Sequence, residues 1–135
     1  MTTELQVLGR EIKRAQWRHH RAFDMRLAES GTTITQWDAL RAIARHPGAS
    51  AHELAGETFQ SDQAFGTLAS RLVAQKLIER RPGWGRRIEH HLTPAGERML
   101  AAGHPIADAV LGESFAALTE PERAQLLALL LTLNG

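Results

Sequence analysis

Apolar residues recur every three or four positions along the first part of the chain. Leu5, Ile12 and Leu27 belong to this series, and charged residues stand between its members. Because an α-helix turns once every 3.6 residues, such spacing gathers the apolar side chains on one face. The pattern predicts a long amphipathic helix over residues 4–29 that ends at Gly31.

Three shorter helices are predicted next, each opened by a hydroxyl side chain that can cap its first turn. The capping residues are Thr35, Ser50 and Ser61. The first two have an acidic residue three positions on, Asp38 and Glu53 respectively. Their apolar stripes contain Trp37, Leu40, Leu54, Phe65, Leu68 and Leu72. The last of the three helices is expected over residues 61–76.

The hydrophobic period then changes from a helical one to two. Ile88, His90 and Leu92 alternate with charged or imidazole side chains, which is typical of a β-strand. Residues 77–81 can supply a partner strand, and Pro82-Gly83-Trp84-Gly85 has the composition of a tight turn. The segment therefore predicts a β-hairpin.

A further helix should follow the hairpin. Thr93 can cap it, and Pro94 suits its first position, where a missing N–H costs nothing. Gly103 and Pro105 are expected to kink or break this helix.

The last helix is predicted to begin at a capping box formed by Thr119 and Glu122. Its leucines surround most of the helix: Leu126, Leu127, Leu129, Leu130, Leu131 and Leu133. Such a helix must be buried, and a single domain of 135 residues has little surface with which to cover it. We therefore expect one mainly α-helical domain with a small β-hairpin, present as a homodimer.

Charge is unevenly distributed, although the net charge is only +1. Residues 71–91 hold six arginines and lysines against two acids, whereas the chain from residue 95 onward is acidic. An anionic partner should therefore meet the middle of the chain. The absence of cysteine excludes disulfides and thiolate metal sites. No apolar run resembles a signal peptide or a membrane span, so a cytoplasmic location is expected.

Three helices followed by a hairpin is the order of a winged helix-turn-helix, in which the third helix enters the major groove of DNA. The outer face of helix 61–76 is small and polar. Gln63 can pair with an adenine edge, Thr67 can touch a thymine methyl, and Arg71 can reach a guanine or a phosphate. Ser61 and the first-turn amides can hold a phosphate. The candidate DNA-binding residues of this helix are Ser61, Gln63, Ala64, Gly66, Thr67, Ser70 and Arg71.

The predicted hairpin carries four arginines, which repel one another and are expected to need an anion to offset them. They are Arg80, Arg81, Arg86 and Arg87. Duplex DNA is the expected anion, and the candidate contacts in the hairpin are Arg81, Trp84, Arg86 and Arg87.

Three segments resemble those of the MarR (multiple antibiotic resistance regulator) family, and the resemblance covers nearly the whole chain. They are Ile34-Thr35-Gln36-Trp37 onward to Gly48, the join from Leu72 to Leu77-Ile78-Glu79-Arg80, and Leu92-Thr93-Pro94-Ala95-Gly96. The resemblance implies a repressor that binds a pseudo-palindromic operator as a two-fold dimer. Residues 1–30 and 95–135 would form the dimerisation helices and residues 33–93 the DNA-binding lobe, with its wing tips in the minor grooves.

The chain departs from the family pattern at two places. Family wings usually carry Asp-x-Arg, whereas this chain has Trp84-Gly85-Arg86, which keeps the arginine and lacks the acid. Trp84 would pack against a sugar or stabilise the turn. Many relatives have Thr-Arg where this chain has Gly66-Thr67, so the operator sequence of a relative cannot be transferred.

The resemblance also implies a pocket for a small aromatic or apolar effector between the dimerisation helices and the lobe. Trp17, His20, Trp37 and Arg41 are the candidates to line it, although Trp37 also fits the core. The histidine pairs at residues 19–20 and 90–91 diverge and so chelate poorly, which predicts no metal site. No catalytic motif or cofactor motif is found, so no enzyme activity and no cofactor are expected.

Two other functions remain open from the sequence. The basic hairpin can dock an acidic protein, in which case large apolar anchors are expected on the outer face of helix 61–76. The second open function is that of a winged helix that binds RNA.

Overall fold

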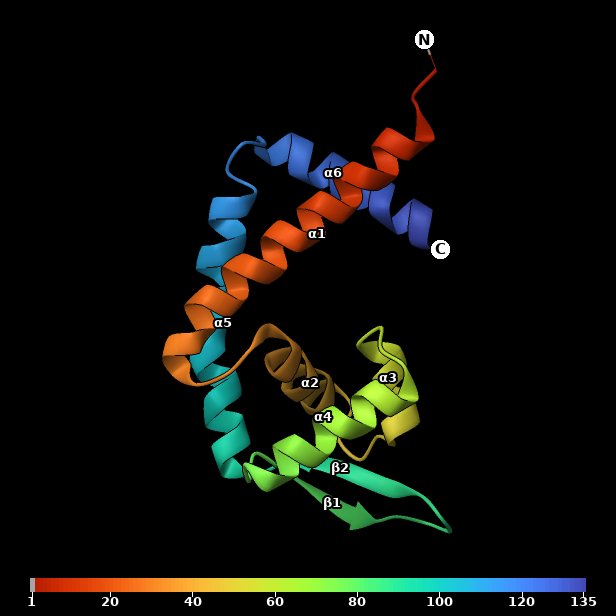
Figure 1. Ribbon diagram of the computed structural model, residues 1–135, viewed down its shortest axis with the longest axis vertical. Coiled ribbons are helices and arrows are strands. Elements are labelled where there is room, and N and C mark those ends of the chain that lie inside the picture. The colour runs from red at the N-terminus through yellow and green to blue at the C-terminus, as the bar shows by residue number, and fades with distance from the viewer. Residues whose placement is uncertain (1) are drawn as a thin grey trace.

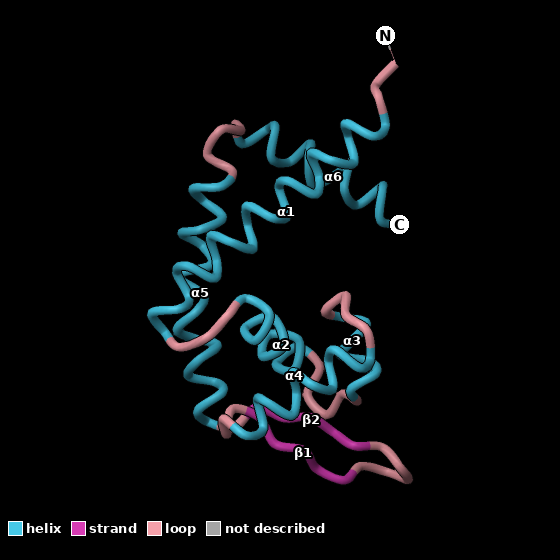
Figure 2. Tube along the Cα trace, in the orientation of Figure 1, coloured by secondary structure: helices cyan, strands magenta, loops and turns pink. Residues whose placement is uncertain are grey.

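Long helices at both ends of the chain flank a lobe of short helices and a hairpin in residues 2–135, which the computed structural model describes (Figure 1). The elements are α1 (Leu5–Leu27), a 3₁₀ turn (Ala28–Ser30), α2 (Ile34–Arg45), α3 (Ala51–Glu57), α4 (Asp62–Ala74), β1 (Ile78–Pro82), β2 (Ile88–Leu92), α5 (Pro94–Ser114) and α6 (Glu120–Asn134). The start of α1 and all of α6 lie at one end of the molecule, and the hairpin lies at the other (Figure 2). The predicted fold class is confirmed.

Hydroxyl side chains cap five helices, four of them where the sequence predicts. Ser50, Ser61, Thr93 and Thr119 each accept a hydrogen bond from the amide three residues on. The predicted cap at Thr35 is wrong, because Thr33 is the extended residue whose Oγ1 accepts from the Gln36 amide at 3.2 Å. Thr35 already lies inside the first turn of α2.

The lobe has its own hydrophobic core. Leu40 of α2, Leu54 of α3, Phe65 and Leu72 of α4, and Ile78 of β1 are fully or almost fully buried against one another. These are the apolar positions that helical and strand periodicity predicts. Their burial fixes which face of α4 points inward, and hence which face is left for a partner.

A second core cluster joins the lobe to the long helices, and Trp37 lies at its centre with 1% of its surface exposed. Its indole Nε1 donates to the Leu100 carbonyl of α5 at 3.1 Å. Phe23 of α1 and Val110 of α5 are among the other buried members of the cluster. The lobe is therefore attached to α1 and α5 by packed side chains as well as by the chain itself.

The predicted break in α5 is absent, since the helix is continuous from Pro94 to Ser114 with Pro105 inside it. Gly103 has a different reason to be there. A Cβ at Gly103 would lie 2.0 Å from Trp37 Nε1, so only glycine lets α5 pass this close to the indole.

The hairpin is antiparallel, with Ile78 opposite Leu92 and Pro82 opposite Ile88. Strand β2 also bonds to the segment before α3. The Gly48 amide donates to the His90 carbonyl, and the His90 amide donates to the Ala49 carbonyl, each at 3.1 Å. Strand β2 is thus tied to the lobe, whereas the tip of the hairpin extends beyond it (Figure 1).

Helix α6 lies away from the lobe, and within residues 2–135 its leucines stay exposed: Leu127, Leu129, Leu131 and Leu133 are 58–67% exposed. Leu5, Val7 and Leu8 at the start of α1 are exposed as well. The sequence predicts a buried α6, and the structure shows that this single chain does not supply the surface that would cover it.

Candidate nucleic-acid interface

The face of α4 that the lobe core leaves free matches the face predicted from the sequence. Gln63, Ala64, Thr67, Ser70 and Arg71 are exposed, and Gly66 between them is half-buried. No large apolar side chain stands among them. The face therefore lacks the anchors that a protein-binding helix is expected to show.

The N-terminus of α4 carries a charged pair that the sequence did not predict. Asp62 lies in the first turn, and its carboxylate contacts His52 Nδ1 of α3 at 2.9 Å. Ser61 uses its hydroxyl as the helix cap, accepting from the Ala64 amide at 3.1 Å. A phosphate at this helix end would meet the Asp62 carboxylate, whose charge His52 offsets when the imidazole is protonated.

Two hydroxyl groups on the outer face of α4 are already hydrogen-bonded. Thr67 Oγ1 donates to the Gln63 carbonyl at 3.1 Å, which leaves the Thr67 methyl for an apolar contact. Ser70 Oγ accepts from the Arg80 guanidinium of β1 at 3.1 Å. This bond joins the outer face of α4 to strand β1, so the helix surface and the hairpin surface are continuous.

The four hairpin arginines do not all rely on an external anion, contrary to the expectation from the sequence. Arg81 pairs with Glu79, and Arg80 bonds to Ser70. Arg87 pairs with Glu53 of α3. Only Arg86 makes no ion pair or hydrogen bond with any of residues 2–135. Its guanidinium is therefore the one among the four that is free for a partner.

Trp84 stands at the hairpin tip beside Arg86. Its side chain is 94% exposed, so it packs against nothing in the lobe. The sequence left two roles open for Trp84, packing against a sugar and stabilising the turn. No contact in the structure supports the second.

His90 lies in the basic hairpin but does not face solvent. It is 2% exposed beneath α4, with its ring edge-on to Phe65 at 6.3 Å between centroids. Its Nδ1–H donates to the Ala49 carbonyl at 2.9 Å, and Nε2 is buried without a partner among residues 2–135. Burial lowers the pKa of His90, so the imidazole is neutral at physiological pH. His91 points to the other side and contacts Glu89.

The predicted effector residues separate into two places. His20, Trp37 and Arg41 line one hollow of about 270 Å³ between α1, α2 and α5. Arg41 lies over the Trp37 ring at 5.1 Å and pairs with Asp38 at 3.4 Å. Trp17 lines a different hollow, where Arg21 lies over its ring at 5.5 Å.

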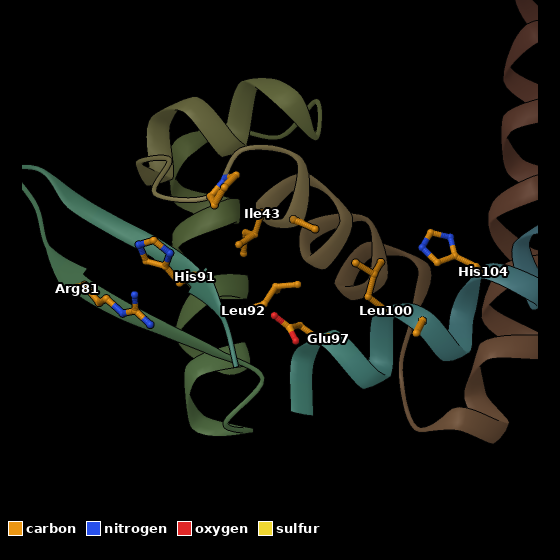
Figure 3. A pocket seen from close by; sticks show the side chains of 10 residues that line it. Ile43, Arg81, His91, Leu92, Glu97, Leu100 and His104 are labelled. Carbon is orange, nitrogen blue, oxygen red and sulfur yellow. The ribbon is translucent and has the colours of Figure 1, made fainter. Parts of the chain in front are cut away.

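A third hollow, of about 340 Å³, was not foreseen from the sequence (Figure 3). It lies where α2 and the hairpin meet α5, with Ile43, Leu92 and Leu100 between Arg81 at one end and His104 at the other. Arg81 already pairs with Glu79, and the His104 ring lies edge-on to Trp37. No single ligand charge follows from this lining.

Residues 2–135 contain no candidate metal site and no helix suited to span a membrane. No group of three or more histidine, cysteine or acidic side chains is placed to hold a metal ion. None of the helices in this range has the length and apolar character needed to cross a membrane.

Comparison with known proteins points to one family. A family model described as MarR family matches residues 30–87, the segment from the end of the first helix through the wing tip. No curated protein matches the chain by sequence.

Solved structures match over almost the full length. A probable transcriptional regulator from Pseudomonas aeruginosa is 28% identical, with a TM-score of 0.85, covering 93% of this chain and 95% of that one. A mutant of MarR from E. coli, complexed with operator DNA, is 24% identical, with a TM-score of 0.88 and coverage of 93% and 92%. BpsR from Bordetella bronchiseptica, whose DNA binding is regulated by 6-hydroxynicotinic acid, is 24% identical, with a TM-score of 0.88 and coverage of 95% and 98%.

Proposed function

Since this chain belongs to the MarR family of winged-helix transcriptional regulators, we propose that it is a sequence-specific repressor that binds double-stranded DNA. The observation that carries the proposal is the continuity of two surfaces. The exposed polar face of α4 is joined through Ser70 and Arg80 to a hairpin whose Arg86 is unpaired. A helix for the major groove and a cation for the adjoining minor groove are thus presented side by side.

We assign different tasks to the residues of this surface. Gln63, Thr67 and Arg71 read base edges in the major groove, and Arg86 enters the minor groove. Ala64 and Gly66 let the helix approach the bases closely, because neither carries a side chain larger than a methyl group. At the margin, Arg81 contacts a phosphate by exchanging Glu79 for it, and Ser61 does so while its hydroxyl still accepts from the Ala64 amide, so both add affinity more than specificity.

Arg87 has a positioning task in this account. Its guanidinium pairs with Glu53 and donates to the Gly48 carbonyl at 3.1 Å. These contacts hold the end of the hairpin loop against α3. The wing then keeps a fixed distance from α4 before DNA arrives, which lowers the entropy lost on binding.

The functional unit is a homodimer in which a second copy covers the exposed leucines of α6 and the start of α1. Contiguous exposed apolar surface of this kind marks an interface. Because a two-fold dimer presents two copies of α4, the operator should be a pseudo-palindrome with half-sites about 10 bp apart, centre to centre.

A small aromatic acid is the proposed effector, bound in the hollow lined by His20, Trp37 and Arg41. The Arg41 guanidinium lies in this hollow, and Asp38, with which it pairs, lines the hollow too, so the carboxylate of the ligand would replace Asp38 as the partner of Arg41. The hollow lies between α1, α5 and the lobe, so a ligand there can favour one spacing of the two lobes. Only unequal affinity for the two spacings would release DNA.

A second candidate function is a protein-interaction module that docks an acidic partner. The observation in its favour is Trp84, because an exposed tryptophan beside arginines is the composition of a binding hot spot.

Selection from a random duplex library separates the two functions. We expect the protein to enrich a pseudo-palindrome that one dimer protects, and a variant with Arg71→Ala and Arg86→Ala to enrich nothing. Failure of the unaltered protein to enrich any sequence would contradict the proposal and favour the protein-partner function.

A further inference from the structure

The tip of the wing carries a large apolar side chain that the fold does not use. Trp84 is 94% exposed, whereas Trp37, the other tryptophan of the lobe, is 1% exposed. The hairpin tip extends away from the helices (Figure 1), so no neighbouring element covers the indole. The indole is therefore available to a partner, to which it offers an apolar face and an N–H donor.

The backbone that carries Trp84 is held in place although the indole is not. The Gly83 amide donates to the Arg87 carbonyl at 2.7 Å, and the Arg87 amide donates to the Trp84 carbonyl at 3.2 Å. Gly85 completes the turn with φ +65°, a conformation that favours glycine. Because the Arg87 side chain is itself anchored to Gly48 and Glu53, the tip is presented on a braced loop.

The charge around the indole selects an anionic partner. Residues 82–88 contain two arginines and no acid, and the unpaired Arg86 lies two positions from Trp84. The two glutamates of the hairpin strands are already engaged, Glu79 by Arg81 and Glu89 by His91. A planar apolar group beside a free guanidinium suits the minor groove of DNA. The negative potential of this groove attracts arginine, and an apolar side chain can enter between its base pairs.

We propose that Trp84 is a wedge that enters the minor groove at each end of the operator, partly unstacks one base step and bends the duplex. This inference rests on the proposed DNA-binding function and deepens it. The wedge should favour flexible pyrimidine–purine steps in the flanks, because these unstack at the lowest cost. Trp84 thereby adds specificity at positions outside the reach of α4.

The test uses the duplex enriched by the wild-type protein from the random library, with a donor and an acceptor dye at its two ends. Single adenines in the flanks are replaced in turn by 2-aminopurine, whose fluorescence rises when it unstacks. The variants are Trp84→Ala and Trp84→Phe. The matched control is Ile88→Ala, which removes an exposed apolar side chain from the last strand pair of the same hairpin, outside the turn that carries Trp84.

The wild-type dimer is expected to shorten the end-to-end distance and to raise 2-aminopurine fluorescence at one step in each flank. Trp84→Ala should bind about tenfold more weakly, which is within the range found for the loss of one base–aromatic stack. It should also leave the duplex straighter and stacked. Its salt dependence should be unchanged, because no charge is removed. Trp84→Phe should restore part of the bend, and Ile88→Ala should behave as wild type.

Equal bending and unstacking by wild type and Trp84→Ala would overturn the wedge while leaving the DNA-binding proposal intact. The wedge is also overturned if Trp84→Ala binds the duplex normally but loses binding to anionic lipid vesicles or to a polyglutamate peptide. If the wild-type protein selects no duplex at all, the wedge and the proposed function fail together.

Discussion

Arg87 of the wing and Glu53 of α3 form an ion pair across the lobe, and the same guanidinium donates to the Gly48 carbonyl at 3.1 Å. The hydrogen bond from Arg87 to the Glu53 side chain, aided by Ser50, holds the pKa of Glu53 below its usual range. The carboxylate therefore stays ionised at lower pH than a free glutamate does. The ion pair therefore tethers the wing to α3 throughout the physiological pH range.

This tether predicts different effects for two neighbouring arginines. Arg86→Ala should weaken operator binding and reduce the slope of log K against log salt by about 1, because one phosphate contact is lost. Arg87→Ala should weaken binding with little change in slope if its guanidinium keeps its pairing with Glu53 and Gly48 when DNA binds. Anisotropy titrations at a series of salt concentrations measure both.

Glu53→Gln is the control for the tether, because it removes the pair while leaving Arg87 in place. We expect it to reproduce the weaker binding of Arg87→Ala. A normal affinity for Glu53→Gln, together with a reduced salt slope for Arg87→Ala, would show that Arg87 contacts phosphate directly.

The close approach of α5 to α2 predicts opposite results for two glycines of the same helix. Gly103→Ala should lower the free energy of unfolding by about 1–3 kcal/mol, because its Cβ would lie 2.0 Å from Trp37 Nε1 and force a shift. Gly112→Ala meets nothing within 4 Å and should stabilise the helix by about 0.5–1 kcal/mol. Urea denaturation of both variants checks this, and equal values would contradict the packing.

Burial of His90 predicts that the fold weakens on mild acidification. Burial lowers the pKa of His90 in the folded state, so between that pKa and about 6.5 the unfolded chain binds a proton that the folded chain does not. Stability is fully present above this window and falls as the pH drops through it, by at most about 1.4 kcal/mol per pH unit.

Melting temperatures measured from neutral to mildly acidic pH report the effect. His90→Asn should show a smaller decline than wild type. An unchanged decline in His90→Asn would assign the acid sensitivity to another group.

The exposed leucines of α6 predict that a charge there separates the subunits. Leu129→Glu and Leu133→Glu should shift the protein from dimer to monomer in analytical ultracentrifugation, because each would place a carboxylate in an apolar interface. Gln125→Glu, at an exposed polar position of the same helix, is the control. A stable dimer in both leucine variants would place the interface elsewhere.

The sequence was most informative where local chemistry and periodicity agree. Helical spacing identified Phe65 and Leu72 as the inner face of α4, and the outer face followed from them. Caps were found by residue type, but Thr35 was chosen for the second helix although Thr33, with Gln36 three residues on, fits the capping-box pattern better.

Long-range pairing was beyond sequence reasoning. Nothing local shows that Arg87 would meet Glu53, or that Asp62 would meet His52, because these partners are brought together only by the packed lobe. Gly103 was expected to weaken α5, whereas its role is to admit Trp37 from another helix.

The most direct test of sequence-specific recognition is an anisotropy titration of the wild-type protein against its enriched duplex and a scrambled duplex of equal composition, at about 50 and 150 mM salt. We predict that binding to the enriched duplex persists at the higher salt with one dimer per site, at least about 1,000-fold tighter than binding to the scrambled one. Equal binding to both duplexes, lost at the higher salt, would contradict sequence-specific recognition and leave only a basic surface.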